Sequence, residues 1–209
     1  MAENAEPVRF HKPHLVIVEG RDEVGFLICL LKQLQIETVQ IHQIRGVSTF
    51  AKKLSVVTKT AGFSDVKRLC ILLDSDLDPA GRQQSIRDAL KGLGLPVPDG
   101  PEVLTDGEFQ VMYSTVPAHN TQGCLEDLLM QSLAGTPQAQ CVDNFLGCAG
   151  MQLVPLNSRW SKAWVHSFLS LADVAGLKIG EATSAGSFDL SHMSFSPMRQ
   201  LITSFAAQP

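Results

Sequence analysis

The chain has 209 residues, which is enough for one large domain or for one domain with an appendage. Its 17 Lys and Arg residues are outnumbered by 21 Asp and Glu residues, for a formal net charge of -4, so the composition carries no global basic signature of a nucleic-acid-binding protein. A nucleic-acid partner would have to be held by a local basic patch or through bound metal.

No apolar run approaches the roughly 18 residues that a membrane span needs, and the polar N-terminal segment MAENAEPVRFHKP lacks the apolar region of a signal peptide. The five cysteines are odd in number and form no CxxC pair, and several lie in apolar runs, where cysteine behaves as a small apolar residue. This usage is typical of a reducing compartment. We therefore expect a soluble, cytoplasmic protein that does not enter a membrane.

Apolar patterning alternates between two periods along the first two thirds of the chain. The run HLVIV at residues 14–18 predicts a short buried strand, whereas residues 22–34 carry apolar side chains at helical spacing. The same criteria predict strands at 14–18, 39–44, 68–73 and 109–116, and helices at 22–34, 48–60, 79–93 and 123–133. Strands that alternate with helices indicate an α/β fold with a mostly parallel, Rossmann-like sheet covered by helices on both faces.

Several helix boundaries have sequence signals. Ser48 is expected to cap the second helix, and Gly62 to stop it. The third helix has Pro79 near its first turn and Gly94 at its end, and a Pro- and Gly-rich loop at 95–106 follows it.

The signals weaken after Gly135. A helix is predicted at 158–171, a Ser-, Gly- and Ala-rich loop at 182–196, and a closing helix at 197–205 with Ser196 as its N-cap. The expected organisation is an N-terminal tail at 1–13, an α/β domain at 14–135, and a helical C-terminal extension at 136–209 packed on the same domain.

Acidic residues follow two of the predicted strands directly. Glu19 follows the first strand, and the third runs through Asp74 and Asp76 in the sequence LCILLDSDLDP. Ligands of an open parallel sheet bind beyond the carboxyl ends of its strands. If strand geometry continues through Ser75, Asp74 and Asp76 point the same way, because side chains alternate with a period of two. We therefore expect Glu19, Asp74 and Asp76 at one rim of the sheet.

Carboxylates clustered at a strand end repel one another, and this cost is most readily tolerated where a cation lies among them. Oxygen-only ligands suit Mg²⁺ or Mn²⁺; Mg²⁺ typically takes one or two carboxylates and completes its octahedron with water and substrate phosphate. The competing interpretation is a turn whose acids cap the helix at Pro79. It fits Asp78 well but fits Asp74 poorly, because Asp74 directly abuts the buried run.

Other motifs fit this stretch less well. An EF-hand loop counted from Asp74 would need Gly and Glu where the chain has Pro79 and Ser85. A DxD nucleophile of the haloacid-dehalogenase type follows the first strand, not the third. No histidine pairs with a cysteine or another histidine at zinc spacing, and no GxSxG nucleophile elbow occurs.

These residues resemble the motifs of the Toprim domain, the metal-binding fold of topoisomerases, primases, recombination-repair proteins and OLD-family nucleases. VEGRDE after the first strand and LLDSD after the third are similar to the Toprim pattern of one strand ending in Glu-Gly and a second ending in Asp-x-Asp. The resemblance implies that Glu19 is the Toprim glutamate and that Asp74 and Asp76 are the DxD pair. The segment GCLEDLL resembles a small bacterial group related to the OLD-like branch.

The resemblance to OLD nucleases implies further site residues. Glu23 occupies the position of their second acid, Glu126 and its neighbour Asp127 are candidates for a later acid, and Lys162 is a candidate for their C-terminal lysine. From the residues alone, Glu23 and Asp127 also fit first-turn acids matched to the helix dipole. Lys162 also fits a solvated helix face. One departure is Leu72, where OLD-like enzymes often carry a polar residue. No GxxxxGK[ST] motif occurs, which excludes a self-contained OLD nuclease but not a free-standing Toprim domain.

The resemblance implies a protein that depends on Mg²⁺ or Mn²⁺ and acts on the phosphodiester bonds of DNA or RNA as a nuclease or phosphotransfer enzyme. The Toprim glutamate and the DxD pair would hold one ion, and Glu23 with Glu126 or Asp127 could hold a second, so that two ions clamp the attacking and leaving oxygens. A protein partner would supply the missing ATPase or a targeting function.

Two other interpretations are non-catalytic. A receiver-like signalling module would use Asp74 as a phosphate acceptor, and Thr115 partly fits its pattern, but Glu19 and Asp76 do not. The third interpretation is a Toprim fold that binds metal or scaffolds a partner without turnover.

Overall fold

The computed structural model describes residues 8–44, 46, 49–151, 158–171 and 176–207. A four-stranded sheet lies at its centre, formed by β1 (His14–Val18), β2 (Val39–Gln43), β3 (Arg68–Asp74) and β4 (Gln110–Val116). The strand order is β2-β1-β3-β4, and every neighbouring pair is parallel. The predicted strands differ from these by at most one residue at either end, and the predicted α/β fold with a parallel sheet is confirmed.

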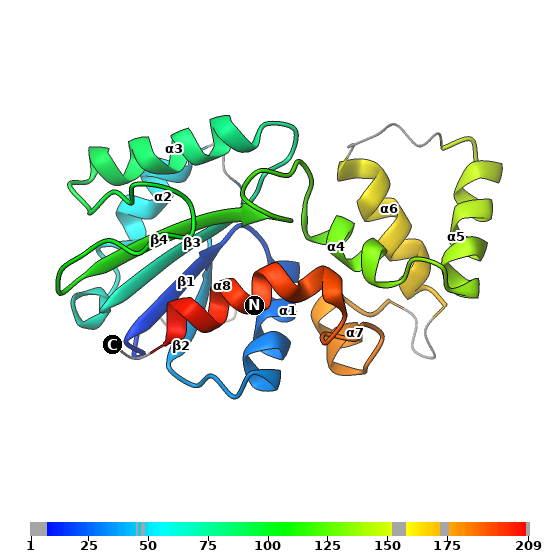
Figure 1. Cartoon of the computed structure of the whole chain (residues 1–209), viewed down its shortest axis with the longest axis horizontal. Helices are drawn as coiled ribbons and strands as arrows, with labels where there is room; N and C mark the ends of the chain where they lie inside the picture. Colours follow the sequence, from blue (N-terminus) through cyan, green and yellow to red (C-terminus); the bar gives the residue numbers. More distant parts are fainter. Residues whose placement is uncertain (1–7, 45, 47–48, 152–157, 172–175, 208–209) are drawn as a thin grey trace, which may run out of the picture.

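Helices cover both faces of this sheet (Figure 1). On one face lie α2 (Phe50–Val57) and α3 (Pro79–Gly92); on the other lie α1 (Arg21–Gln33) and α8 (Ser196–Ala206). The strands serve both layers because their side chains alternate. In β1, Leu15 and Ile17 belong to the core shared with α2 and α3, whereas Val16 and Val18 belong to the core shared with α1 and α8. A strand buried on both faces therefore reads as one continuous apolar run.

The remaining helices extend the layer that contains α1. They are α4 (Leu125–Ser132), α5 (Pro137–Cys148), α6 (Ser158–Leu169) and α7 (Ile179–Ser184), with short 3₁₀ turns at Phe63–Asp65 and Met193–Phe195. Their apolar side chains join the core of the α1 face. None of the described helices combines the length and apolar character that a membrane crossing requires.

The C-terminal part of the chain departs from the sequence-based predictions in three places. Helix α5 was not predicted, although Thr136 accepts a hydrogen bond from the Ala139 N–H and Pro137 occupies the first turn. Helix α7 enters the segment predicted as loop, because Ala182 is fully buried against α1. Ser196 is the first residue of α8 and not its cap, since Phe195 holds that position.

The other boundary predictions are confirmed in part. Helix α3 begins at Pro79 and ends at Gly92, and Gly94 follows it with a φ of 66°. Helix α2 begins at Phe50; its predicted cap, Ser48, lies outside the described residues. The prediction that Gly62 stops this helix was wrong, because α2 ends at Val57 with Thr58 as its C-cap. Gly62 instead precedes the 3₁₀ turn at Phe63–Asp65 with a φ of 84°, a conformation that glycine adopts without a steric cost.

Two contacts fix C-terminal helices to the α/β core, one through α1 and one through the sheet. Gly25 of α1 and Gly180 of α7 face each other so closely that a Cβ on Gly180 would lie 2.5 Å from the Gly25 Cα. Arg68 of β3 donates to the Phe205 carbonyl at 3.0 Å, which ties the end of α8 to the sheet. The first contact places α7 against α1, and the second anchors the end of α8 at the amino end of β3.

Candidate functional site

A pocket of about 490 Å³ opens at the carboxyl ends of β1 and β3. We call it the acid pocket, after the carboxylates that line it: Glu19, Asp22, Glu23, Asp74, Asp76 and Glu126. The first three come from the β1–α1 junction, the next two from the end of β3, and Glu126 from the first turn of α4. Lys162 and His166 of α6 line the same pocket. Of the seven predicted site residues, six line this pocket, and Asp127 does not.

The turn after β3 is built mainly by hydrogen bonds to the segment that follows β4. The Ser75 hydroxyl lies 2.6 Å from the carbonyl oxygens of both Val116 and Thr121. The backbone of Asp76 exchanges two hydrogen bonds with Gly123, at 2.9 and 2.8 Å. Buried serine and backbone groups thereby find partners at the strand end, which fixes the DxD turn relative to α4.

One expectation about this turn was wrong. Strand geometry does not continue through Ser75, because Asp76 adopts a φ of 47° in the left-handed region. Such a conformation is tolerated most readily by Gly, Asn and Asp. Asp74 and Asp76 still reach the same pocket, but the turn places them there, not the alternation of a strand.

Asp74 is the most buried of the DxD carboxylates. Its side chain belongs to a residue that is only 6% exposed, and one oxygen accepts the Leu125 N–H at 3.3 Å. Burial raises the pKa of Asp74 well above its usual value, and the nearby carboxylates of Glu23, Glu126 and Glu19 raise it further. A cation among these groups would favour the ionised form and reverse both effects.

The two glutamates of the β1–α1 junction are in a similar state. Burial raises the pKa of Glu19, with Arg82 opposing the rise and Asp76 adding to it. Burial also raises the pKa of Glu23; its own backbone N–H opposes the rise, whereas Glu126 and Glu19 add to it. The pocket therefore concentrates carboxylates that repel one another in the absence of a cation.

Lys162 and His166 lie one helical turn apart on α6 and face these acids. Partial burial acts to lower the pKa of Lys162, but the negative charges of Glu126 and Asp74 outweigh it, so the pKa is raised. Lys162 is exposed, as expected for a solvated helix face, yet it also lines the pocket. The sequence-based predictions did not include His166. Its spacing of four residues from Lys162, which puts both on one face of a helix, was the only sign that it could belong to the site.

Arg82 is a second residue beside the site that was not predicted from the sequence. It lies in the first turn of α3 and donates to the Asp76 carboxylate at 2.6 Å and to the Asp74 carbonyl at 2.9 Å. Asp78, in contrast, accepts the Gly81 N–H at 2.9 Å as the N-cap of α3, which confirms the cap interpretation. No local sequence pattern predicts that Arg82 reaches the site, because its partners lie outside its own helix.

Asp127 has a structural task in this fold. One carboxylate oxygen accepts the Cys124 N–H at 2.8 Å, which caps α4, and the other accepts the Ser161 hydroxyl of α6. Its neighbour Glu126 is buried, at 5% exposure, and lines the acid pocket. We therefore leave Asp127 out of the ligand set that is proposed below, and keep Glu126.

The receiver-like interpretation finds little support in this geometry. The described residues form a four-stranded sheet, so the lysine that a receiver carries after a fifth strand has no counterpart among them. The Thr115 hydroxyl points into the turn after its own strand, with the Ala118 carbonyl 3.3 Å away.

Comparison with known proteins adds a family and a fold. A family model described as "Protein of unknown function (DUF3226)" matches residues 13–206. The chain belongs to this family. A comparison of the DUF3226 chain with curated proteins gave no match.

Solved structures show which fold the DUF3226 chain has. It is similar to the C-terminal region of the Burkholderia pseudomallei OLD protein, with a TM-score of 0.55 and 15% identity over 95% of this chain and 100% of that one. It is also similar to the C-terminal region of the Xanthomonas campestris pv. campestris OLD protein, in structures phased with mercury and with platinum. Their TM-scores are 0.51 and 0.50, each at 13% identity, over 94% and 93% of this chain and 97% and 94% of those chains. The fold is therefore that of an OLD-like Toprim domain, as predicted.

Proposed function

We propose that the acid pocket binds Mg²⁺ or Mn²⁺ and that the protein cleaves phosphodiester bonds of nucleic acid. The observation that supports this proposal is the gathering of five carboxylates from three separate segments around a single open pocket: Glu19, Glu23, Asp74, Asp76 and Glu126. Two of them, Asp74 and Glu126, are almost fully buried. A protein gains nothing in stability from such mutual repulsion, so a cationic ligand is the simplest reason for it.

The donor set fits a hydrated hard cation better than a chelated one. Among the described residues, no group of three or more His, Cys, Asp and Glu side chains is already arranged to hold a metal ion. Mg²⁺ commonly takes only one or two carboxylates and keeps several water molecules, so it does not need such a cage. All the acidic donors are oxygens, which suits Mg²⁺ and Mn²⁺ and disfavours zinc.

Each residue then has a distinct task. Glu19, Asp74 and Asp76 would hold one cation near the sheet. Glu23 and Glu126 would hold a second. Lys162 and His166, on the open side of the pocket, would contact a substrate phosphate, because both present nitrogen donors toward the acids. When bound, the ions would neutralise charge on the phosphoryl group and activate a water molecule for attack.

The substrate proposed is DNA or RNA, as the Toprim resemblance implies. The formal net charge of -4 means that the protein's own field does not attract a polyanion, so intrinsic affinity should be weak and sensitive to salt. A partner protein that delivers the nucleic acid, or that carries an ATPase, would compensate for this weakness.

The test is cleavage of supercoiled plasmid, single-stranded DNA and single-stranded RNA at low ionic strength with Mn²⁺. The wild type should cleave at least one substrate, and Glu19→Gln, Asp74→Asn and Glu126→Gln should each remove the activity. Asp78→Asn is the matched control, because Asn caps a helix as well as Asp and Asp78 does not line the pocket. Activity that survives Asp74→Asn would contradict the proposal.

Calorimetry with Mn²⁺ separates the two parts of the proposal. Metal binding without cleavage of any substrate would leave the metal site but contradict the nuclease, and would favour a metal-binding scaffold. The absence of both binding and cleavage would contradict the whole proposal.

A further inference from the structure

The two edge strands of the sheet differ in how far their outer backbone groups are hydrogen-bonded. On the outer side of β4, the backbone N–H of Glu102 donates to the Tyr113 carbonyl at 2.7 Å, and the backbone N–H of Thr105 donates to the Val111 carbonyl at 3.0 Å. The loop before β4 therefore covers that edge. The opposite edge is β2, which pairs only with β1 in the described part of the sheet. An open edge presents unpaired backbone groups to any extended chain that approaches it.

The backbone of β2 shows which groups remain available. The His14 N–H donates to the Thr38 carbonyl, and the Ile44 N–H donates to the Val18 carbonyl. The backbone N–H and C=O groups of the even-numbered residues of this segment therefore point toward β1. Those of the odd-numbered residues point outward, away from the sheet. Of these, the Val39 carbonyl accepts the Lys12 ammonium at 3.2 Å, whereas the N–H and C=O of Ile41 have no partner among the described residues.

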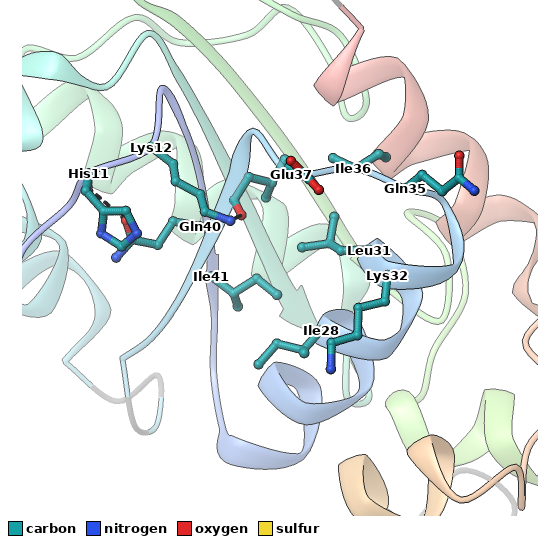
Figure 2. Close-up of a pocket in the computed structure, with 11 residues that line it drawn as sticks. His11, Lys12, Ile28, Leu31, Lys32, Gln35, Ile36, Glu37, Gln40 and Ile41 are labelled. Carbon is teal, nitrogen blue, oxygen red and sulfur yellow. Dashed lines mark hydrogen bonds between the residues drawn. The ribbon is translucent and has the colours of Figure 1, made fainter.

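An apolar groove of about 750 Å³ lies directly beside this edge. Its floor is formed by Ile41 of β2 and by Ile28 and Leu31 of α1, and Figure 2 shows these side chains between β2 and the helix. Ile28 is 42% exposed, so its apolar surface is available to a ligand in the groove. A strand added to β2 would place every second side chain over Ile41 and into this groove.

The charge around the groove selects its occupant. Lys12 and Lys32 stand on either side of the apolar floor, with one acid, Glu37, near them (Figure 2). The local charge is thus positive on a chain whose formal net charge is -4. A second copy of this chain would bring its own two lysines to the same place, since a two-fold interface uses the same patch on both subunits. An acidic segment would instead neutralise them.

We propose that the β2 edge and its groove bind an extended segment of a partner protein, with apolar side chains at alternate positions and acidic residues beside them. Backbone hydrogen bonds to Ile41 would give the strand its register, and the groove and the two lysines would give it specificity. The surface lies at β2 and α1, away from the residues that line the acid pocket, so the inference does not depend on the proposed function.

The probe is a fluorescent synthetic peptide of about eight residues, a common strand length, with Val at alternate positions and Glu or Thr between them. We expect saturable binding by fluorescence anisotropy and slower hydrogen exchange at the Ile41 amide. The same peptide with N-methyl groups on the edge-facing amides should bind at least about tenfold more weakly, which corresponds to about 1.4 kcal/mol. Equal binding of the methylated peptide would contradict strand addition.

Variants of exposed residues test the groove itself. Ile28→Glu should weaken binding of the acidic peptide at least about tenfold. Lys32→Glu should do the same and should gain affinity for a peptide in which Lys replaces Glu, a reversal that a misfolded variant could not produce. Both residues are exposed, so the melting temperature should barely change.

Two results would overturn the proposal. One is the failure of wild-type protein to bind any of these peptides. The other is a dimer in sedimentation velocity that Ile28→Glu dissociates, which would assign the groove to a second copy of the chain.

Discussion

The guanidinium of Arg82 lies 2.6 Å from a carboxylate oxygen of Asp76 and forms a salt bridge at the rim of the acid pocket. Through its Nε the same side chain donates to the backbone carbonyl of Asp74 at 2.9 Å. One arginine therefore binds both aspartates of the DxD turn. A cation that uses the Asp76 carboxylate has to compete with this guanidinium.

Replacing Arg82 should consequently separate two effects. Arg82→Ala should lower the free energy of unfolding by about 1–2 kcal/mol, through the loss of one charged hydrogen bond and one partly exposed ion pair. It should also tighten Mn²⁺ binding by about 5–10-fold in calorimetry, because a competing charge worth about 1 kcal/mol is removed.

Arg87→Ala is the matched control, since Arg87 lies on the same helix and binds the Pro98 carbonyl. It should leave Mn²⁺ affinity unchanged. Weaker Mn²⁺ binding by Arg82→Ala would mean that the arginine holds Asp76 in place for the ion, and would contradict the competition described above.

The burial of Asp74 among other acids predicts linkage between metal binding and stability. Mn²⁺ at 100 times its Kd should stabilise the wild type by about 2.7 kcal/mol, which corresponds to a rise in Tm of about 5–10 °C for a chain of this size. Asp74→Asn should abolish that rise while leaving the metal-free protein as stable or more stable, because a neutral amide does not repel its neighbours. Asp88→Asn, on the exposed side of α3, should keep the full response. A wild type whose Tm ignores Mn²⁺ would show that the acid cluster is not a metal site.

The same carboxylates predict the sign of the pH dependence in chelator. The pKa values of Glu19, Glu23 and Asp74 are raised in the folded state above their ordinary values of 4.5, 4.5 and 3.8. Above the ordinary values the folded protein therefore holds protons that the unfolded chain has released. The stabilisation is complete below about pH 4 and is lost as pH rises through the raised pKa values.

Chemical denaturation of the wild type and of Asp74→Asn across this range measures the effect as a difference. The stability of the wild type relative to Asp74→Asn should fall as pH rises and then level off. Parallel curves for the two proteins would contradict the raised pKa of Asp74.

The fold could be predicted largely from local patterns, and its exceptions have a common cause. Strands β1 and β3 are buried on both faces, so their apolar runs are conspicuous, and Pro79 and Gly94 mark the ends of α3. Helix α7 has only six residues, and its packing depends on the close approach of Gly180 to Gly25, far away in sequence. A helix that depends on tertiary contacts leaves little trace in its own sequence.

The site could be predicted in part, for the same reason. Glu19 and Asp74 follow buried parallel strands, and the rule that such strand ends meet at one edge brought them together correctly. Asp76 was placed correctly for the wrong geometric reason, because its left-handed backbone is visible only in the structure. Arg82 and His166 reach the pocket from helices whose placement depends on the whole fold, so no spacing rule could identify them. Whether the pocket binds an ion stays a prediction.

Because α1 and α7 approach each other closely at Gly180, adding one methyl group at this position should destabilise the fold. A Cβ on Gly180 would lie 2.5 Å from the Gly25 Cα and 2.9 Å from its carbonyl carbon, so backbone and not a flexible side chain must move. Gly180→Ala should therefore lower the free energy of unfolding by about 1–3 kcal/mol, a typical cost of overpacking. Gly147→Ala, in α5, is the matched control: nothing lies within 4 Å of its added Cβ, so it should stabilise by about 0.5–1 kcal/mol through helix propensity. Urea denaturation of both variants measures these changes. A neutral Gly180→Ala would mean that α7 does not pack on α1 as closely as described.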